Sequence, residues 1–570
     1  MVWYHKMVQL LPNYVIATMT AETIPTPRIT SPKVEFTLGR ALLWFGIAAL
    51  FTALQIQQSL NYGRLVFGFM FDDDLIYYAD SLKYLHSLQT RGLPSLIESF
   101  IKTPPHAFGA TLPALLGFTV FGIHDWAPSA ARGLVIFGMI LFVGEYLCRG
   151  FSLVWKLIIV ALTLSWRMLG LLIVAGRPDV IFGLLLACGI VLITESSWLK
   201  SSWQKQVITG AFFGAAFVCK PSMFPVSLFL LFSALFVASF IDTWRDRSNR
   251  KKLLTANIYC VATALAVMAP YYLVYGRSAI DYFISVIFGK GNEVWHQNLS
   301  LMEHASYYIT GAAGKWLMGH YWLGAWMFLA VINLFIYWRR NRREFWSSFI
   351  QKFPLALPIM MILTWLVLSI PKTKSPYFGV VLAGLFLLTT MQMLIFLIRQ
   401  CRSLSPSKYW FGVWLGALGL VGFAWGQARW PDIIYDRETG LRIYKVTEQL
   451  AGDIQNDIPS EAKILVLSRW YVHIAKYHIS KRRAGKKYEF PQDYLFYFND
   501  LKTNRKLLAE ADYVIIELPF DHLSWLPAYS HLPTLFSEIQ SSPRFRLWRE
   551  YPDYLSDKGG KILIYQRVNK

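Results

Sequence analysis

Long apolar segments separate the charged residues of this 570-residue chain into short clusters. A helix needs about 20 apolar residues to cross about 30 Å of hydrocarbon. Charged residues form only 16% of the chain, whereas soluble domains contain about 25%. The pattern predicts a polytopic α-helical membrane protein. We assign eleven transmembrane helices, at 39–60, 127–149, 153–174, 178–194, 206–219, 222–241, 253–275, 321–338, 354–370, 377–398 and 409–427.

The distribution of Lys and Arg predicts how these helices are oriented. Short cytoplasmic loops collect basic residues. The strings RDRSNRKK (245–252) and RRNRR (339–343), and the loop with Arg399, Arg402 and Lys408, follow spans six, eight and ten. We therefore expect residues 1–38 to form a cytoplasmic N-terminal tail. The C-terminus is expected on the extracytoplasmic side, preferably the periplasmic side of a bacterial inner membrane.

The chain divides into a membrane domain and a soluble domain. The membrane domain covers 39–428 and includes a large first extracytoplasmic loop, 61–126. Within that loop, the apolar segment 110–122 is too short to cross and is expected to lie at the interface or re-enter. Residues 429–570 are predicted to form an extracytoplasmic α/β domain. We expect its strands at 462–468, 511–518 and 560–568, and helices at 442–454 and 504–511.

The net charge of +21 does not indicate nucleic acid as a partner. Residues 430–570 contain 21 Lys and Arg and 18 Asp and Glu, so most of the excess lies in the membrane domain. There it matches topology signals and attraction to anionic membrane lipids. No nucleic-acid motif is present. The five cysteines lie in or beside spans and form no CxxC pattern, so neither a disulfide framework nor a cysteine metal site is predicted.

Charged residues also gather in the loops of the predicted extracytoplasmic side. The string FDDDLIYYADSLKYLHSLQ begins an amphipathic pattern, which predicts a helix lying along the membrane with the aspartates at its N-terminus. Taken alone, such a run is as often a solvated loop end. The other positions are Arg177 and Asp179 in GRPDV, Lys220, and Lys372, Lys374 and Tyr377 in PKTKSPY.

Each of these loops also has a purely structural interpretation. Arg177 and Asp179 could form a surface ion pair of little energetic value. Lys220 alone is best interpreted as a loop lysine that extends to the interface. The two lysines and the tyrosine of PKTKSPY suit a phosphate group, although any basic loop could contain them. Arg167, inside the third span, could reach the same phosphate.

Four short motifs together resemble the polyprenyl-phosphate-dependent glycosyltransferases of the GT-C superfamily. They are FDDDLIYY, TPPHAFGATLPALLGFTVFG followed by AARG, GRPDV and KTKSPYF. Similar patterns occur in protein O-mannosyltransferases, lipid A aminoarabinose transferases and relatives acting on the lipopolysaccharide core. Many relatives have an Asp-Glu pair where this chain has three aspartates. Counting back from Tyr77 favours Asp73, with Asp74 beside it, and Asp72 is the alternative.

The resemblance implies a hexosyl- or pentosyltransferase of the cell envelope. Its donor would be a polyprenyl-phosphate-linked sugar, and its acceptor a glycan, lipid or protein on the extracytoplasmic face. Such a transfer needs a base for the acceptor hydroxyl and cations for the departing phosphate. We expect Asp73 to be the base. Asp74 and Asp179 would position the acceptor, and the phosphate would be met by Arg167, Arg177, Lys372, Lys374 and Tyr377.

Two questions remain open at this level. A divalent cation such as Mg²⁺ or Mn²⁺ is possible, because Asp73, Asp74 and Asp179 offer hard oxygen ligands. A transporter or flippase for lipid-linked sugars would also need many spans and a basic site. It would be expected to carry internal repeats and broken helices at mid-membrane. A noncatalytic envelope assembly subunit is the third class, and it would tolerate loss of the aspartates.

Overall fold

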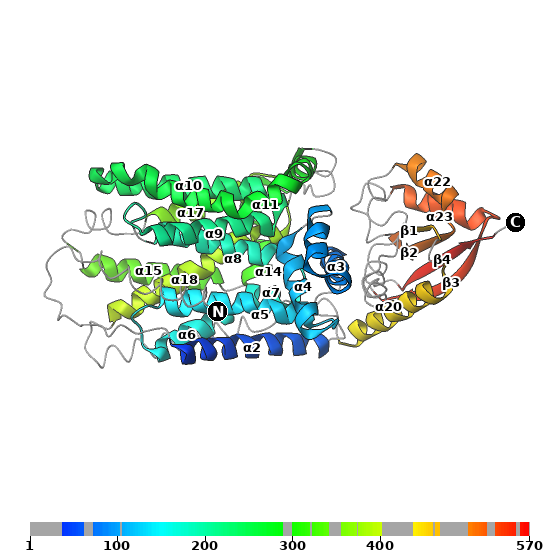
Figure 1. Cartoon of the computed structure of the whole chain (residues 1–570), viewed down its shortest axis with the longest axis horizontal. Coiled ribbons are helices and arrows are strands. Elements are labelled where there is room, and N and C mark those ends of the chain that lie inside the picture. Colours follow the sequence, from blue (N-terminus) through cyan, green and yellow to red (C-terminus); the bar gives the residue numbers. More distant parts are fainter. Residues whose placement is uncertain are drawn as a thin grey trace.

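The computed structural model describes residues 37–61, 72–102, 105, 107–195, 197–288, 299–319, 322–340, 342, 355–372, 374–401, 437–459, 462–467, 500–520, 530–554 and 559–568. These residues form a helical bundle and a smaller α/β domain beyond one end of it (Figure 1). Two predicted segments, the tail at 1–36 and the span at 409–427, lie outside the described residues.

The bundle consists of helices joined end to end by short turns. Helix α5 continues into a π-helical segment, η2, and α6 and α7 meet at a bend of 65°. The bundle elements are α2 (Leu38–Asn61), α5 (Ala127–Ile140), η2 (Leu141–Leu147), α6 (Leu153–Leu164), α7 (Arg167–Val174), α8 (Asp179–Thr194), α9 (Trp203–Cys219), η3 (Pro221–Met223), α10 (Phe224–Arg245), η4 (Arg247–Lys252), α11 (Leu253–Phe288), α13 (Leu301–Ser306), α14 (Ala312–Met318), α15 (Trp322–Arg340), α17 (Ala356–Ser369), η5 (Pro376–Gly379) and α18 (Val380–Cys401).

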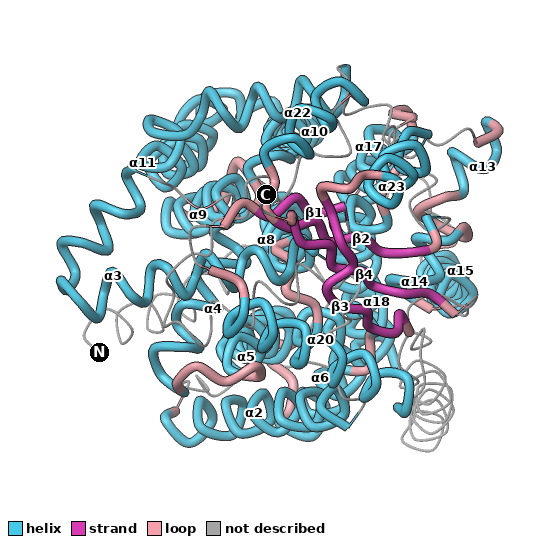
Figure 2. The backbone as a smooth tube through the Cα atoms, turned by 90° about the vertical axis from the view of Figure 1, so that its right-hand side faces the viewer, coloured by secondary structure: helices cyan, strands magenta, loops and turns pink. Residues whose placement is uncertain are grey.

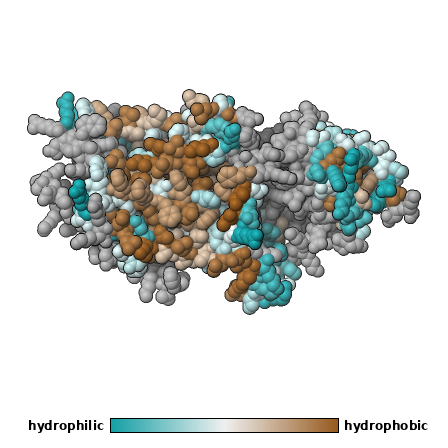
Figure 3. Space-filling model, turned by 90° about the horizontal axis from the view of Figure 1, so that it is seen from above, coloured by the Kyte–Doolittle hydropathy of each residue, from teal (hydrophilic) through white to brown (hydrophobic). Residues whose placement is uncertain are grey.

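The described helices confirm a multi-pass membrane protein but not the count of eleven spans. Six of them are long and apolar enough to cross, or seven if the bent pair α6 and α7 is one span. Helices α8 and α17 are apolar but shorter. Large apolar side chains such as Phe236, Leu273 and Phe335 are exposed on the bundle. Figure 3 shows a wide hydrophobic surface on the bundle, as expected of a protein whose solvent there is lipid.

The first loop forms a cap of two helices across one end of the bundle. Helix α3 (Asp72–Lys102) is broken at Gly92, whose φ of 73° only glycine adopts readily, two residues before Pro94. The two halves fold back on each other, since Ser99 Oγ lies 3.0 Å from Ser87 Oγ. Figure 2 shows α3 running across this end. The sequence pattern correctly predicts a helix starting at the aspartates.

Helix α4 (Phe108–Phe121) is the second helix of the cap. It is a short apolar helix of 14 residues, in keeping with the prediction that 110–122 is too short to cross. It packs against α3, α5 and α9. Its Ala110, Ala114 and Phe118 are buried in these contacts, which fix the cap on the bundle.

The C-terminal domain contains a four-stranded sheet in the order β1-β2-β4-β3. Strand β1 is parallel to β2, and β4 is antiparallel to both β2 and β3. The sequence correctly predicts β1 (Ile464–Leu467), β2 (Tyr513–Leu518), β4 (Gly560–Arg567), α20 (Arg437–Asp457) and α22 (Leu501–Glu510). It misses α23 (Leu532–Ser541) and β3 (Phe545–Asp553). The missed strand is at the sheet edge and largely exposed, so its charged side chains hide the apolar pattern.

Helices α8 and α18 form the buried centre of the bundle. They run in the same direction, because Gly183 lies against Val380 and Ala187 against Gly384. A Cβ atom on Gly183 would be only 2.7 Å from the carbonyl carbon and oxygen of Val380. Glycine at this position therefore allows the two helices to begin side by side, which brings the turns before them together.

Replacing Gly183 by alanine is expected to destabilise the bundle by about 1–3 kcal/mol, because the added methyl group forces backbone apart. The measurement is the thermal unfolding midpoint of the purified protein in detergent. Gly138→Ala is the matched control, since nothing lies within 4 Å of a Cβ there. A Gly183→Ala protein as stable as Gly138→Ala would contradict this account of the packing.

Candidate active site

The turn before α8 carries Asp179 as the first helical residue. Its carboxylate is almost fully buried and accepts a hydrogen bond from the Lys220 ammonium, at the end of α9. The Cys219 thiol donates to the Pro178 carbonyl across 3.5 Å. Lys220 is thus paired with Asp179 rather than extended to the interface, which corrects the interpretation made from sequence. The signal available in the sequence was the need of a buried carboxylate for a cation.

The second cation of this turn, Arg177, stacks on the tyrosine of the PKTKSPY loop. The Arg177 guanidinium carbon lies 4.3 Å from the centroid of the Tyr377 ring. Tyr377 is buried and also meets Trp316 edge to face, with ring centroids 5.0 Å apart. A cation over an aromatic face is held by the ring quadrupole. The GRPDV and PKTKSPY loops are therefore adjacent, as the sequence predicts from their common side.

Helix α14 connects this cluster with Arg167. The Arg167 Nη1 atom lies 3.4 Å from the carbonyl oxygen of Lys315, the residue before Trp316. The Lys220 ammonium lies 5.5 Å from the centroid of the Phe378 ring. Cations from three separate connections thus lie around the aromatic residues of α14 and η5. Trp316 was not identified from sequence, because one tryptophan in an aromatic-rich loop carries no distinguishing pattern.

The two lysines of PKTKSPY occupy different environments. Lys372 is exposed. Lys374 is buried, and its ammonium donates to the carbonyls of Leu368 and Ser369 at 3.0 and 2.8 Å. Those carbonyls belong to the last turn of α17, where a cation is favoured by the helix dipole. Burial lowers the pKa of Lys374 to about 8. Lys374 therefore holds the turn, and Lys372 presents its charge to solvent.

The aspartate run begins α3, and contacts between described residues link α3 to this cluster. The side chains of Asp72, Asp73 and Asp74 lie outside the described part of the chain. Ser81 Oγ donates to the Thr111 carbonyl at 3.0 Å, which joins α3 to α4. A Cβ atom on Gly109, at the start of α4, would collide with Cys219 and touch Pro178. Helix α3, α4 and the Asp179 turn are therefore consecutive layers at the same end of the bundle.

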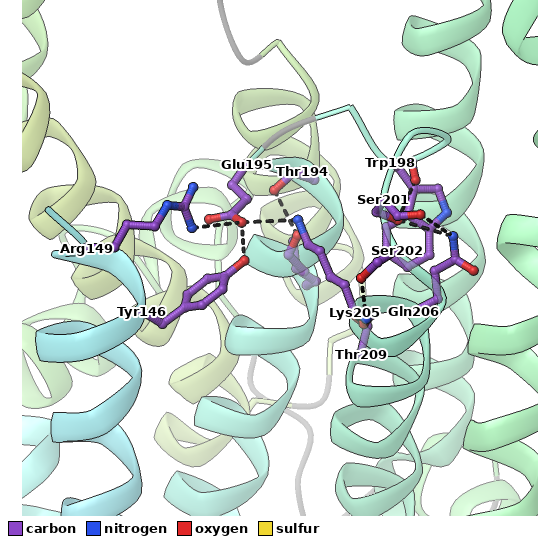
Figure 4. Close-up of polar contacts among 11 residues, drawn as sticks. Tyr146, Arg149, Thr194, Glu195, Trp198, Ser201, Ser202, Lys205, Gln206 and Thr209 are labelled. Atoms are coloured by element: carbon purple, nitrogen blue, oxygen red, sulfur yellow. Dashed lines mark hydrogen bonds and ion pairs between the residues drawn. The ribbon is translucent and has the colours of Figure 1, made fainter. Parts of the chain in front are cut away.

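A second polar cluster lies at the opposite end of α8 and α9. Glu195 accepts hydrogen bonds from Tyr146 and from Lys205, whose ammonium is 3.1 Å away, and it faces Arg149 (Figure 4). Glu145 similarly pairs with Lys156 and accepts from the Trp44 indole at 2.8 Å. Both carboxylates have cationic partners that join neighbouring helices. We assign this cluster a structural role.

In the part of the chain that the structure describes, the carboxylates do not come together in a group that could hold a metal ion. No group of three or more His, Cys, Asp or Glu side chains is close enough there to hold an ion. Asp179, one of the three proposed ligands, is engaged by Lys220. The described residues alone thus do not fit a resident divalent cation.

Removing either member of the Asp179 and Lys220 pair is expected to cost about 3–5 kcal/mol, because the other charge stays buried without a partner. The double variant Asp179→Asn/Lys220→Met should lose much less than the sum of the single variants. Thermal unfolding of the four proteins in detergent measures this coupling. Additive losses would show that the two side chains do not stabilise each other.

The stability of the protein is expected to depend on pH through Lys374. Its pKa is lowered in the folded protein, so the unfolded chain binds more protons between about pH 8 and about pH 10.4. The stability difference between wild type and Lys374→Gln should therefore shift in favour of wild type as pH rises from 7.5 to 9.5, by less than about 1.4 kcal/mol per pH unit. The exposed Lys372→Gln is the control and should show no such shift. Equal pH dependence in both variants would contradict the assignment.

Comparison with known proteins finds solved structures that have a similar fold but finds no relative in sequence. No protein-family profile matches the chain, and no curated protein matches it in sequence. The structure is similar to ArnT from Cupriavidus metallidurans in the apo state, with a TM-score of 0.54 and 14% identity over 92% of this chain and 98% of that one. The same protein bound to undecaprenyl phosphate gives a TM-score of 0.50 at 14% identity, covering 93% and 98% of the two chains.

A second solved protein has the same architecture. The Archaeoglobus fulgidus oligosaccharyltransferase in complex with Zn and sulfate gives a TM-score of 0.50 and 13% identity, over 92% of this chain and 73% of that one. ArnT and this oligosaccharyltransferase are both GT-C glycosyltransferases. The resemblance expected from four short motifs is confirmed at the level of the fold: the chain has the fold of GT-C membrane glycosyltransferases.

Proposed function

We propose that the protein is a membrane glycosyltransferase that moves a sugar from a polyprenyl-phosphate donor to a hydroxyl acceptor on the extracytoplasmic face. The observation that carries the proposal is the meeting of Arg177, Tyr377 and the Asp179 and Lys220 pair at the end of the bundle covered by α3. The GT-C fold supports it, since the solved ArnT binds undecaprenyl phosphate. The acceptor belongs to the envelope glycans, lipids or proteins.

The proposed reaction is a single displacement at the sugar. The acceptor oxygen bonds to the anomeric carbon, while the bond from that carbon to the phosphate oxygen breaks. The electron pair of the broken bond goes to the polyprenyl phosphate, and the hydroxyl proton goes to the Asp73 carboxylate. The charge on the leaving phosphate grows as that bond breaks. Cations that already face it stabilise the transition state.

The geometry suggests a division of labour among the cations. Arg177 and Lys372 would contact the phosphate, since Lys372 is exposed and the Arg177 guanidinium can donate two parallel hydrogen bonds. Arg167 would lie behind them, beside α14. Lys374 would keep the PKTKSPY turn in place, and Tyr377 would orient Arg177. Lys220 would hold the Asp179 carboxylate in place for contact with the acceptor.

In this proposal, a divalent cation would be held only by the aspartate run. With Asp179 engaged, Asp73 and Asp74 are the carboxylates that would hold Mg²⁺ or Mn²⁺, and the ion would neutralise phosphate charge. The flippase alternative is less favoured, because the described ion pairs gather at the two ends of the bundle rather than at its middle.

Asp73→Asn is expected to abolish sugar transfer, with a loss of at least about 100-fold, because the acceptor proton loses its base. Expression and membrane insertion should be unchanged. The measurement is mass spectrometry of envelope glycans, lipids and proteins from cells that carry wild type, Asp73→Asn or no copy of the gene. Arg442→Gln, an exposed substitution in the C-terminal domain, is the control and should match wild type.

Each outcome of this comparison has a distinct meaning. A sugar modification present with wild type and absent from both other strains supports the enzyme. A modification retained by Asp73→Asn would overturn the assignment of the base. If wild type moves a labelled lipid-linked sugar across the membrane and no new glycosidic bond forms, the protein is a transporter instead.

A further inference from the structure

The polar cluster around Glu195 contains more positive charge than its carboxylate neutralises. Glu195 faces two cations, Lys205 and Arg149 (Figure 4). The Lys205 ammonium is largely buried and lies 3.1 Å from the Glu195 Oε1 atom. The Arg149 Nη1 atom lies 3.9 Å from the same oxygen, too far for a hydrogen bond, and 39% of the Arg149 side chain is exposed. Lys205 therefore neutralises Glu195, and the charge of Arg149 is left over at the surface.

The neighbouring carboxylate, Glu145, has the same arrangement of cations. The buried Lys156 ammonium binds it directly. The Arg40 Nη1 atom lies 3.7 Å from Glu145 Oε2, again beyond hydrogen-bond distance. In both groups a buried lysine satisfies the carboxylate, and an arginine lies further out. This end of the bundle thus carries positive charge in excess of the carboxylates that join its helices.

A second arginine lies beside Arg149. Arg399, in the last turn of α18, is exposed, and its Nη2 atom lies 3.4 Å from the Arg149 carbonyl oxygen. The guanidinium carbon of Arg399 lies 5.4 Å from the centroid of the Phe151 ring, and that of Arg149 lies 5.3 Å from the centroid of the Tyr146 ring. Contacts with an aromatic ring orient a cation without neutralising it. Two oriented arginines therefore meet at the turn between η2 and α6.

This turn lies where membrane hydrocarbon reaches the protein. Val154, in the first turn of α6, is 65% exposed, and Leu153 beside it is 37% exposed. Apolar side chains exposed on an apolar bundle face lipid tails. The two arginines lie at helix ends next to these side chains. A positive site and an apolar surface are thus adjacent, as the phosphate and the acyl chains are adjacent in a phospholipid.

We propose that Arg149 and Arg399 form a binding site for the headgroup phosphate of an anionic phospholipid. Guanidinium groups bind phosphate oxygens through parallel hydrogen bonds, and basic pockets between transmembrane helices recognise anionic headgroups. The acyl chains lie against Leu153 and Val154. A soluble anion is attracted by the same charge but gains no contact with these apolar side chains, so the lipid is the better occupant.

This site is separate from the proposed active site and does not rest on the proposed function. Helix α8 has 16 residues and spans about 24 Å between the Asp179 turn and the Glu195 cluster. The lipid is therefore neither the donor nor the acceptor of the proposed transfer. Because Arg149 belongs to the turn after η2 and Arg399 to α18, a phosphate held by both links two parts of the bundle. We expect the bound lipid to stabilise the folded protein.

Lipid retention measures the site directly. The purified full chain in neutral detergent is mixed with dioleoylphosphatidylglycerol or with dioleoylphosphatidylcholine, and native mass spectrometry counts the lipids that stay bound. Wild type should retain the phosphatidylglycerol in preference to the phosphatidylcholine. Arg149→Gln and Arg399→Gln should each weaken the apparent affinity for phosphatidylglycerol about fivefold, and the double variant about 30-fold.

The matched control is Arg342→Gln. Arg342 is an exposed arginine whose guanidinium carbon lies 5.3 Å from the centroid of the Trp338 ring, after α15. Helix α15 is parallel to α18, since Trp326 binds Thr389 and Asn333 binds the Met393 carbonyl, so Arg342 lies at the same end as Arg399. Its removal should leave phosphatidylglycerol retention unchanged. An equal loss in Arg342→Gln would show that only the general surface charge attracts the lipid, and would overturn the site.

Thermal unfolding provides a second readout. Phosphatidylglycerol should raise the unfolding midpoint of wild type more than phosphatidylcholine does, and this difference should vanish in the double variant. If Arg149→Gln folds poorly, Arg399→Gln alone carries the test, because Arg399 is exposed. Equal retention of both lipids by wild type would refute the proposal. So would an equal rise in midpoint with inorganic phosphate at the same concentration, since the occupant would then be a soluble anion.

Discussion

The cost of a charge without a partner inside an apolar bundle governs the arrangement of this protein. Water is absent from the hydrocarbon, so an ionised side chain there needs an opposite charge or a dipole. Asp179 and Lys220 meet this requirement at the junction of α8 and α9. The pair can form only because α8 begins beside α18 and the end of α9. The packing of these helices therefore also brings the residues of the site together.

Aromatic side chains complement the ion pairs at this end of the bundle. Arg177 stacks on the Tyr377 ring, and the Lys374 ammonium lies 5.3 Å from the centroid of the Tyr308 ring. The Phe378 ring lies near the Lys220 ammonium. Such contacts orient cations without neutralising them. An excess of oriented positive charge is what a phosphate leaving group needs. The surroundings of the site therefore favour an anionic ligand even though each cation also has a structural contact.

Much of the architecture follows from the sequence because lipid imposes simple rules. Apolar segments of sufficient length must be helices there. Strands β1, β2 and β4 are predicted because their side chains are apolar on both faces. Strand β3 and helix α23 are missed because edge exposure weakens the pattern. The bend between α6 and α7 is missed because the two helices together are apolar enough to be interpreted as one span.

The sequence by itself determined which residues are ionisable and which loops share one end of the bundle, since apolar length and basic loops encode topology. Only the tertiary structure decided their partners. It joined Lys220 to Asp179, placed Arg177 on Tyr377, turned Lys374 toward the end of α17 and brought Arg399 to Arg149. The physical reason is that burial and pairing depend on the distance between helices. That distance is decided by side-chain packing among residues far apart in the chain, such as Gly183 against Val380.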